Sequence, residues 1–347
     1  NYADLDTANV AINVATVAYY SAGTAANNWS FQSYRTWVGG NAGNETLWNT
    51  AANWSPSGVP GAADDVIIAY ALYQPVVDVA TANTKNLTIQ ANATLDLNGN
   101  ALTMAVGSTF TNQGTLRLQG VEVLTNFAND TTQGKVEYYG TAGSATLVGG
   151  STYYDLKING ANTWTPGAAV VVNRNFTMPA GTLQLAGNDL TVSASVNLTG
   201  GTALTQTGAA RLIMNPSGSA TLNTGGLSLR NLQISSGTVT LSSALTLAGD
   251  LVITAGTFDV TTSNHAIVVN GNWSNSNGAS GFSARSGTVT ISNATTTTHT
   301  ITGNTTFRNL TSTTSVAASL TFATGSVTTV ATGGVLTITG TSGNLLS

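Results

Sequence analysis

The sequence contains no cysteine, which excludes disulfide bonds, thiolate metal sites and cysteine nucleophiles. Charged residues are also scarce: 10 Lys and Arg and 14 Asp and Glu make up 7% of the 347 residues, where an average soluble domain has about 25%. With so few cations and a net charge of −4, the chain has no basic stripe to neutralise nucleic-acid phosphates. No uninterrupted apolar run is long enough to span a bilayer. We therefore expect no nucleic-acid partner and no membrane span.

Uncharged polar residues take the place of the missing charges, since the chain is rich in Thr, Asn, Ser and Gly. Its 41% of apolar residues and low net charge do not fit a disordered chain. A surface with many hydroxyls and few charges is more typical of extracellular than of cytoplasmic proteins, so we predict a secreted protein, outside the cell or on its surface. The chain begins at Asn1 and not at Met, which fits removal of a signal peptide, although an artificial boundary would look the same.

Internal repeats organise most of the chain. A short string with Asn or Asp followed by Leu recurs four times, at residues 85–89, 154–158, 230–234 and 308–312. The Asn or Asp positions are 69, 76 and 78 residues apart. This self-similarity predicts modules of about 75 residues, each built from shorter strand-turn units.

Strict alternation of apolar and polar residues predicts β-strands within each module, as at residues 182–185, 238–241 and 335–338. Gly and Asn pairs such as Asn98-Gly99 interrupt the alternation at the intervals expected for tight turns. An all-β sandwich and a β-solenoid both fit short strands with regular turns. We favour a parallel β-helix (β-solenoid), because stacked coils explain why similar units recur with variable spacing.

The N-terminal region differs from the repeats. Four of the six tryptophans lie between Trp29 and Trp54, with three prolines nearby, which is typical of an irregular, aromatic-rich cap. Before it, residues 10–20 form an uncharged, β-prone segment. We predict an N-terminal β-strand arm at 1–35, a cap at 36–80 and the solenoid at 81–347. The two ends of a solenoid carry unpaired backbone groups that can template another strand.

Several segments of the chain lie at residues 36–40, 48–55 and 58–68, and a repeat lies at 287–291 and 299–310. These segments resemble secreted repetitive β-solenoid surface proteins of bacteria, which are adhesin-like or autotransporter-like. The resemblance covers roughly residues 36 to 340. It implies an exposed structural or adhesive role and no catalytic residues. The N-terminal arm departs from the pattern, and no sorting or anchoring domain is recognisable.

Residues that could carry chemistry are few. Asp64-Asp65 is the one adjacent acidic pair, and we read it as a turn leading into a strand rather than as a calcium or acid-base site. His265 takes the place of Asn in other modules, and His299 aligns with Ala145 and Ala220, so we expect no histidine-metal site. Threonine stripes such as Thr288 and Thr290 suit an ice-binding array, but Thr is also a common outward strand residue. We predict no catalytic residue, no metal and no cofactor.

These features predict the structural subunit of an extracellular filament, a homopolymer in which β-solenoids stack head to tail through the N-terminal strand and the open solenoid ends. The candidate subunit contacts are Val10, Ile12, Val14, Thr16, Val17, Tyr19 and Tyr20. The alternative is a monomeric adhesin stalk or a surface module that binds glycans by stacking sugars on Trp37, Trp48 and Trp54. A third possibility is an enzyme that acts on polysaccharides. Such an enzyme needs converging carboxylates, and the few Asp and Glu residues are spread thinly along the sequence.

Overall fold

The computed structural model describes residues 33–347 except 142, 294–296 and 345. The seven subunit-contact candidates between Val10 and Tyr20 lie outside the described residues. Within the described part, the regular elements are strands β1 to β37 and two short 3-10 helices, η2 (Ala51–Asn53) and η3 (Gly278–Ser280). The all-β prediction is therefore confirmed. The chain divides into two units, the first with described residues 33–115 and 123–128, the second with 116–122 and 129–347.

The first unit contains the aromatic cap and the first coils. One sheet has the order β2 (Trp54–Ser55), β1 (Ser33–Trp37), β3 (Asp64–Ile68), β5 (Leu87–Ile89) and β8 (Phe110–Asn112). A second sheet has the order β10 (Leu124–Thr125), β7 (Ala101–Met104) and β4 (Thr81–Thr84). Strand β6 (Thr94–Asp96) forms a bridge to Val76. β1 pairs with β3 in parallel and with β2 in antiparallel orientation, so β2 covers the edge of the sheet at β1.

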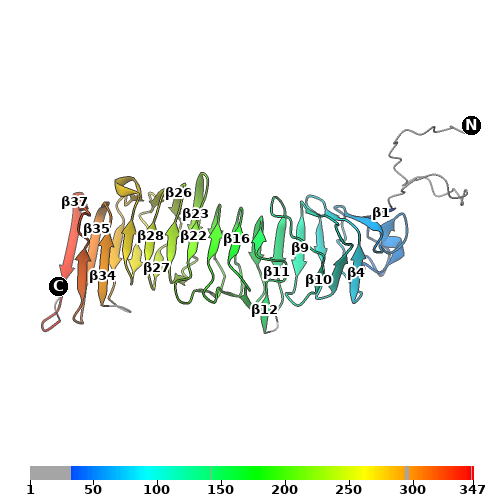
Figure 1. The fold of residues 1–347 in the computed structure, drawn as a ribbon, viewed down its shortest axis with the longest axis horizontal. Helices are drawn as coiled ribbons and strands as arrows, with labels where there is room; N and C mark the ends of the chain where they lie inside the picture. Colours follow the sequence, from blue (N-terminus) through cyan, green and yellow to red (C-terminus); the bar gives the residue numbers. More distant parts are fainter. Residues whose placement is uncertain (1–32, 142, 294–296, 345) are drawn as a thin grey trace, which may run out of the picture. The chain divides into compact units, whose positions relative to one another are not determined.

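The second unit is a β-solenoid whose coils stack one beside the next (Figure 1), and the strands of these coils form three sides. The first side consists of β9 (Thr115–Leu118), β11 (Lys135–Tyr138), β14 (Asp155–Ile158), β17 (Phe176–Thr177), β20 (Val196–Asn197), β23 (Ser219–Asn223), β26 (Thr238–Leu241), β29 (Thr257–Asp259) and β32 (Phe282–Ser283). The second side consists of β13 (Thr152–Tyr153), β16 (Val170–Val172), β19 (Leu190–Val192), β22 (Leu212–Met214), β25 (Leu232–Ile234), β28 (Leu251–Ile253), β31 (Trp273–Asn275), β34 (Thr298–Thr302) and β36 (Ser319–Phe322).

Two successive sheets form the third side. The earlier sheet has β12 (Ser144–Thr146), β15 (Thr163–Thr165), β18 (Thr182–Gln184) and β21 (Ala203–Thr205). The later sheet has β24 (Ser228–Leu229), β27 (Leu245–Leu247), β30 (Ile267–Val269), β33 (Thr288–Ile291), β35 (Thr305–Thr313) and β37 (Thr328–Thr339). The chain visits the three sides in turn, so each strand pairs with the strand one coil away.

Parallel register between coils confirms the β-solenoid. On the second side Leu232 pairs with Leu251, Leu251 with Trp273, and Trp273 with Ile301. Successive coils along this column therefore differ by 19, 22 and 28 residues. All four side chains are 0% exposed, because alternate residues of every strand point into the interior. Stacked inward columns of this kind form the core of the unit.

The recurring sequence strings do not occupy equivalent places in these coils. Within the second unit, the strings lie on three different sides of the solenoid. Asp155 begins β14, Asn231 directly precedes β25, and Asn309 lies within β35. The coil, with its variable length, is the repeating unit of the structure here.

Candidate assembly surface

The three predicted sugar-stacking tryptophans form the interior of the cap in the first unit. Trp37, Trp48 and Trp54 are 1%, 1% and 2% exposed. The ring of Trp54 meets Trp37 and Trp48 edge to face, with centroids 5.0 and 4.7 Å apart. The indole nitrogen of Trp37 donates to the carbonyl of Tyr73, and that of Trp54 donates to the carbonyl of Trp48. These rings present no face to a sugar, so the carbohydrate-stacking prediction for them is wrong; the buried indoles of Trp37 and Trp54 instead donate their N–H groups within the cap.

Exposed aromatic residues lie elsewhere in the first unit. Tyr70 is 69% exposed, Tyr73 42%, and Leu72 between them 85%. They follow β3 in a connecting segment. Reasoning from the sequence overlooked them because tryptophan was expected to be the stacking residue; the run Tyr70-Ala71-Leu72-Tyr73, just after an apolar strand, was the available signal.

Both carboxylates of the acidic pair have hydrogen-bond partners in the first unit. Asp64 Oδ2 accepts a hydrogen bond from the Gly61 N–H at 2.8 Å and lies 3.8 Å from Arg35 Nε. Asp65 Oδ1 accepts from Asn86 Nδ2 at 2.7 Å. The two carboxylates have different partners because neighbouring strand residues point to opposite faces. Among the described residues, no group of three His, Cys, Asp or Glu side chains is placed to hold a metal ion.

His299 is completely buried, with Nδ1 2.9 Å from the Gly271 carbonyl oxygen and Nε2 3.0 Å from Asn293 Oδ1. The alignment of His299 with Ala145 and Ala220 is wrong, because β34, β12 and β23 belong to different sheets. Both ring nitrogens contact oxygen atoms of neighbouring turns, which gives His299 a structural place in the solenoid.

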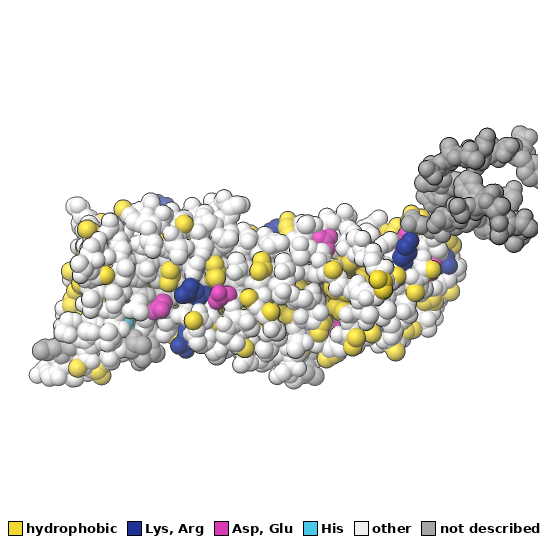
Figure 2. Space-filling view, in the orientation of Figure 1, with side chains coloured by type: hydrophobic (Ala, Val, Ile, Leu, Met, Phe, Trp, Pro, Cys, Tyr) yellow, Lys and Arg dark blue, Asp and Glu magenta, His cyan; other side chains and the backbone are white. Residues whose placement is uncertain are grey.

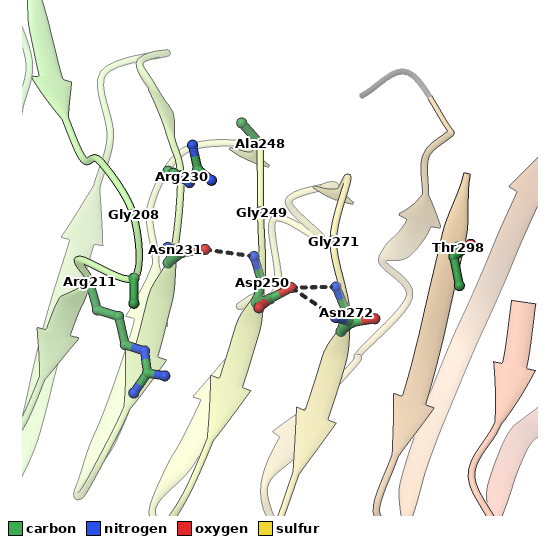
Figure 3. A pocket seen from close by; sticks show the side chains of 11 residues that line it. Gly208, Arg211, Arg230, Asn231, Ala248, Gly249, Asp250, Gly271, Asn272 and Thr298 are labelled. Atoms are coloured by element: carbon green, nitrogen blue, oxygen red, sulfur yellow. Dashed lines mark hydrogen bonds between the residues drawn. The ribbon is translucent and has the colours of Figure 1, made fainter. Parts of the chain in front are cut away.

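A ladder of Asn and Asp side chains joins successive coils (Figure 3). Asn231 Oδ1 accepts from the Asp250 N–H at 3.0 Å, Asp250 Oδ1 accepts from the Asn272 N–H at 2.7 Å, and Asn272 Oδ1 accepts from the Thr300 N–H at 2.8 Å. Each side chain thus binds the backbone of the following coil. We call this arrangement the Asx ladder. It explains why Asn or Asp precedes the inward Leu in the recurring strings.

The Asx ladder borders a shallow hollow of about 390 Å³, also lined by Arg211, Arg230 and Thr298 (Figure 3). Arg211 Nη1 donates to Gln233 Oε1 at 2.9 Å. The oxygens of Asn231 and Asp250 that face along the ladder already accept backbone hydrogen bonds. The hollow therefore lies beside side-chain oxygens that already join successive coils.

A similar hydrogen bond joins the last two described strands of the third side. Asn309 Oδ1 accepts from the Val335 N–H at 3.2 Å. Val335 has no side-chain acceptor to offer to a further coil, and it is 58% exposed. Among the described strands, β37 is the last of its sheet and pairs along one edge with β35.

The free edge of β37 carries uncovered core residues. Leu336 and Ile338 pair with Leu310 and Ser312 of β35. Leu310 and Ser312 are 0% exposed, but Leu336 and Ile338 are 53% and 40% exposed. We call β37 with Leu336 and Ile338 the acceptor edge. Unpaired backbone groups beside exposed apolar residues form a surface ready to receive another strand.

Comparison with known proteins gives one partial match. A family profile described as Domain of unknown function (DUF8693) matches residues 36–148, which is less than half of the chain and begins at Thr36, where the cap begins. No curated protein and no solved structure matches the chain. None of the helices that the structure describes is long and apolar enough to cross a membrane.

Proposed function

We propose that this protein is the structural subunit of an extracellular filament, in which copies join head to tail through the N-terminal strand of one copy and the acceptor edge of the next. The observation that carries the proposal is the exposure of Leu336 and Ile338, which continue buried columns of the core. A strand added at β37 would both satisfy its backbone groups and cover these side chains. The work of the protein is then mechanical, with no catalytic role.

The edges of the described sheets differ in a way that favours this mode of joining. In the first unit, β2 already occupies the edge of the sheet at β1. Direct stacking of coil upon coil, which the sequence also suggested, therefore has no free ladder at β1. A separate segment such as residues 10–20 can supply the strand that pairs with β37. One donor and one acceptor per copy make the contact heterologous, and such contacts produce open fibres unless they close into a ring.

The composition of the surface supports self-association. Most of the surface visible in Figure 2 is uncharged, with Lys, Arg, Asp and Glu side chains few and scattered. Copies with little net charge repel one another weakly. The same polar, uncharged character supports a location outside the cell.

Negative-stain electron microscopy of the full chain and of a variant lacking residues 1–20 tests the proposal. We expect filaments from the full chain and none from the shortened one. A matched control is Tyr70→Ser, which changes an exposed residue away from the acceptor edge and should leave filaments intact. Absence of filaments from the full chain would refute the filament, and unchanged filaments after the deletion would refute the role of the segment.

A second candidate function is glycan binding by a monomeric adhesin. The exposed side chains of Tyr70 and Tyr73 favour it, because tyrosine rings can stack on sugars and also offer a hydroxyl. Binding on a glycan array that is lost in Tyr70→Ala, with no filaments in the microscope, would favour the adhesin. Binding that persists in Tyr70→Ala and Tyr73→Ala would exclude this surface.

A further inference from the structure

The last sheet of the solenoid has a regular side-chain pattern that a further strand must continue. Its strands present an inward aliphatic residue, an outward residue and a second inward residue. The triplets are Leu245-Thr246-Leu247 in β27, Ile267-Val268-Val269 in β30, Val289-Thr290-Ile291 in β33, Leu310-Thr311-Ser312 in β35 and Leu336-Thr337-Ile338 in β37. The inward residues are at most 2% exposed in every strand of this set except β37. The acceptor edge therefore lacks one more aliphatic pair.

Residues 10–20 contain such a triplet. Ile12-Asn13-Val14 has two aliphatic residues around a polar one, in a segment free of charge, proline and glycine. Ile12 and Val14 repeat the inward pair Ile267 and Val269 of β30. The 11 residues of the segment also nearly equal the 12 residues of β37.

We infer that residues 10–20 of a second copy pair with β37 in parallel, with Ile12 over Leu336, Asn13 beside Thr337 and Val14 over Ile338. This inference rests on the proposed filament and specifies its contact. Parallel pairing follows the orientation of every neighbour in this sheet, including β35 and β37. A strand in this orientation continues the inward columns of the solenoid without a break.

The neighbouring positions distinguish this register from the next one. A shift by two residues would place Val10 and Ile12 inward, with Ala11 in the outward position that Thr occupies in four of the five triplets. In the inferred register a polar residue, Asn13, takes that position. The next inward residue is then Thr16, just as Thr314, which is 6% exposed, follows Ser312 in the coil of β35.

Engineered cysteines test the register, because the natural chain has none. Neighbouring parallel strands lie about 4.8 Å apart, within the Cα separation of about 4.4 to 6.8 Å that a disulfide spans. We expect full-length Asn13→Cys/Thr337→Cys protein to give a ladder of covalent multimers after mild oxidation. Two strand spacings, about 9.6 Å, separate Asn13 from Thr311 in this arrangement, so Asn13→Cys/Thr311→Cys should remain monomeric on the same denaturing gel.

Three results would overturn the inference. A ladder from Ala11→Cys/Thr337→Cys but not from Asn13→Cys/Thr337→Cys would show the shifted register. Dimers from Thr337→Cys alone would show that two acceptor edges pair with each other. Filaments visible in the microscope without any ladder would show that another contact joins the copies. Electron microscopy of the same samples separates these results from failure of the proposed function, in which filaments and ladder are both absent.

Discussion

Leu310 and Leu336 are partners in parallel register, yet Leu310 is 0% exposed and Leu336 is 53% exposed. The residue type and the direction of the side chain are the same. The difference is that β37 covers Leu310, whereas no described strand covers Leu336. Burial in a solenoid depends on the following coil, so the two leucines should respond differently to substitution.

Leu310→Ala should lower the free energy of unfolding by about 2 to 5 kcal/mol, the usual cost of a cavity in a packed core. Leu336→Asp should change it by about 0.5 kcal/mol or less, as at exposed sites, but should prevent filament formation because a buried unpaired charge is costly at the contact. Urea unfolding followed by circular dichroism and electron microscopy measure the two effects. Normal filaments from Leu336→Asp would contradict this explanation.

Asn231 tests the contribution of the Asx ladder to stability. It is 9% exposed, accepts from the Asp250 N–H and donates through Nδ2 to the Ala210 carbonyl at 2.9 Å. Asn231→Ala removes both hydrogen bonds and leaves the Asp250 N–H without this acceptor, so we expect the free energy of unfolding to fall by about 1 to 3 kcal/mol. Asn231→Asp keeps the acceptor and should lose less. Equal unfolding midpoints in urea for the Ala variant and the natural chain would show that the ladder contributes nothing.

Gly303 and Gly325 form a matched pair for testing how closely coils approach. Both have left-handed φ angles, +83° and +78°, which cost a residue with a side chain about 1 to 2 kcal/mol. A Cβ on Gly303 would lie 1.9 Å from the Asn275 carbonyl oxygen, whereas one on Gly325 would meet nothing within 4 Å. Gly303→Ala should therefore be clearly less stable than Gly325→Ala in thermal unfolding. Equal melting temperatures would contradict the close approach.

Acid should remove the stability contributed by Asp259. Arg285 donates to both carboxylate oxygens, from Nε at 3.0 Å and Nη2 at 2.7 Å, and these hydrogen bonds lower the pKa of Asp259. A lowered pKa in the folded state means that the ionised form stabilises the fold above the unfolded-state pKa of about 3.9. This contribution disappears as the pH falls through the lowered value.

Melting temperatures of the natural chain and Asp259→Asn, measured between pH 7 and pH 2, check this prediction. The natural chain should melt higher at pH 7, and the difference should vanish toward pH 2. A difference that stays constant over this range would mean that the carboxylate charge is not its source.

Local features of the fold were readable from the sequence. Alternation at residues 238–241 predicted a strand, and β26 (Thr238–Leu241) has Val239 and Leu241 buried. The Asn98-Gly99 pair predicted a tight turn, and both residues have positive φ angles, 51° and 80°. These predictions succeeded because alternation and turn chemistry act over a few residues.

The side of the solenoid on which each strand lies could not be predicted in the same way. Because coils vary from 19 to 28 residues along one column, similar strings arrive on different sides. Burial of Trp37, Trp48 and Trp54 likewise depends on how the cap closes, which their spacing does not reveal. The sequence predicted that a solenoid has open edges, but it did not identify the residues of the acceptor edge. The exposure of Leu336 depends on which of the described strands is last in the sheet.

The Asx ladder also bears on how the protein folds. Each rung requires only the coil before it, so the order of assembly can follow the order of synthesis, with every finished turn serving as a template for the next. Nearest-neighbour dependence of this kind lets repeat proteins grow from a nucleus by propagation. During synthesis or export, the chain can therefore fold one coil at a time, before its C-terminal residues are available.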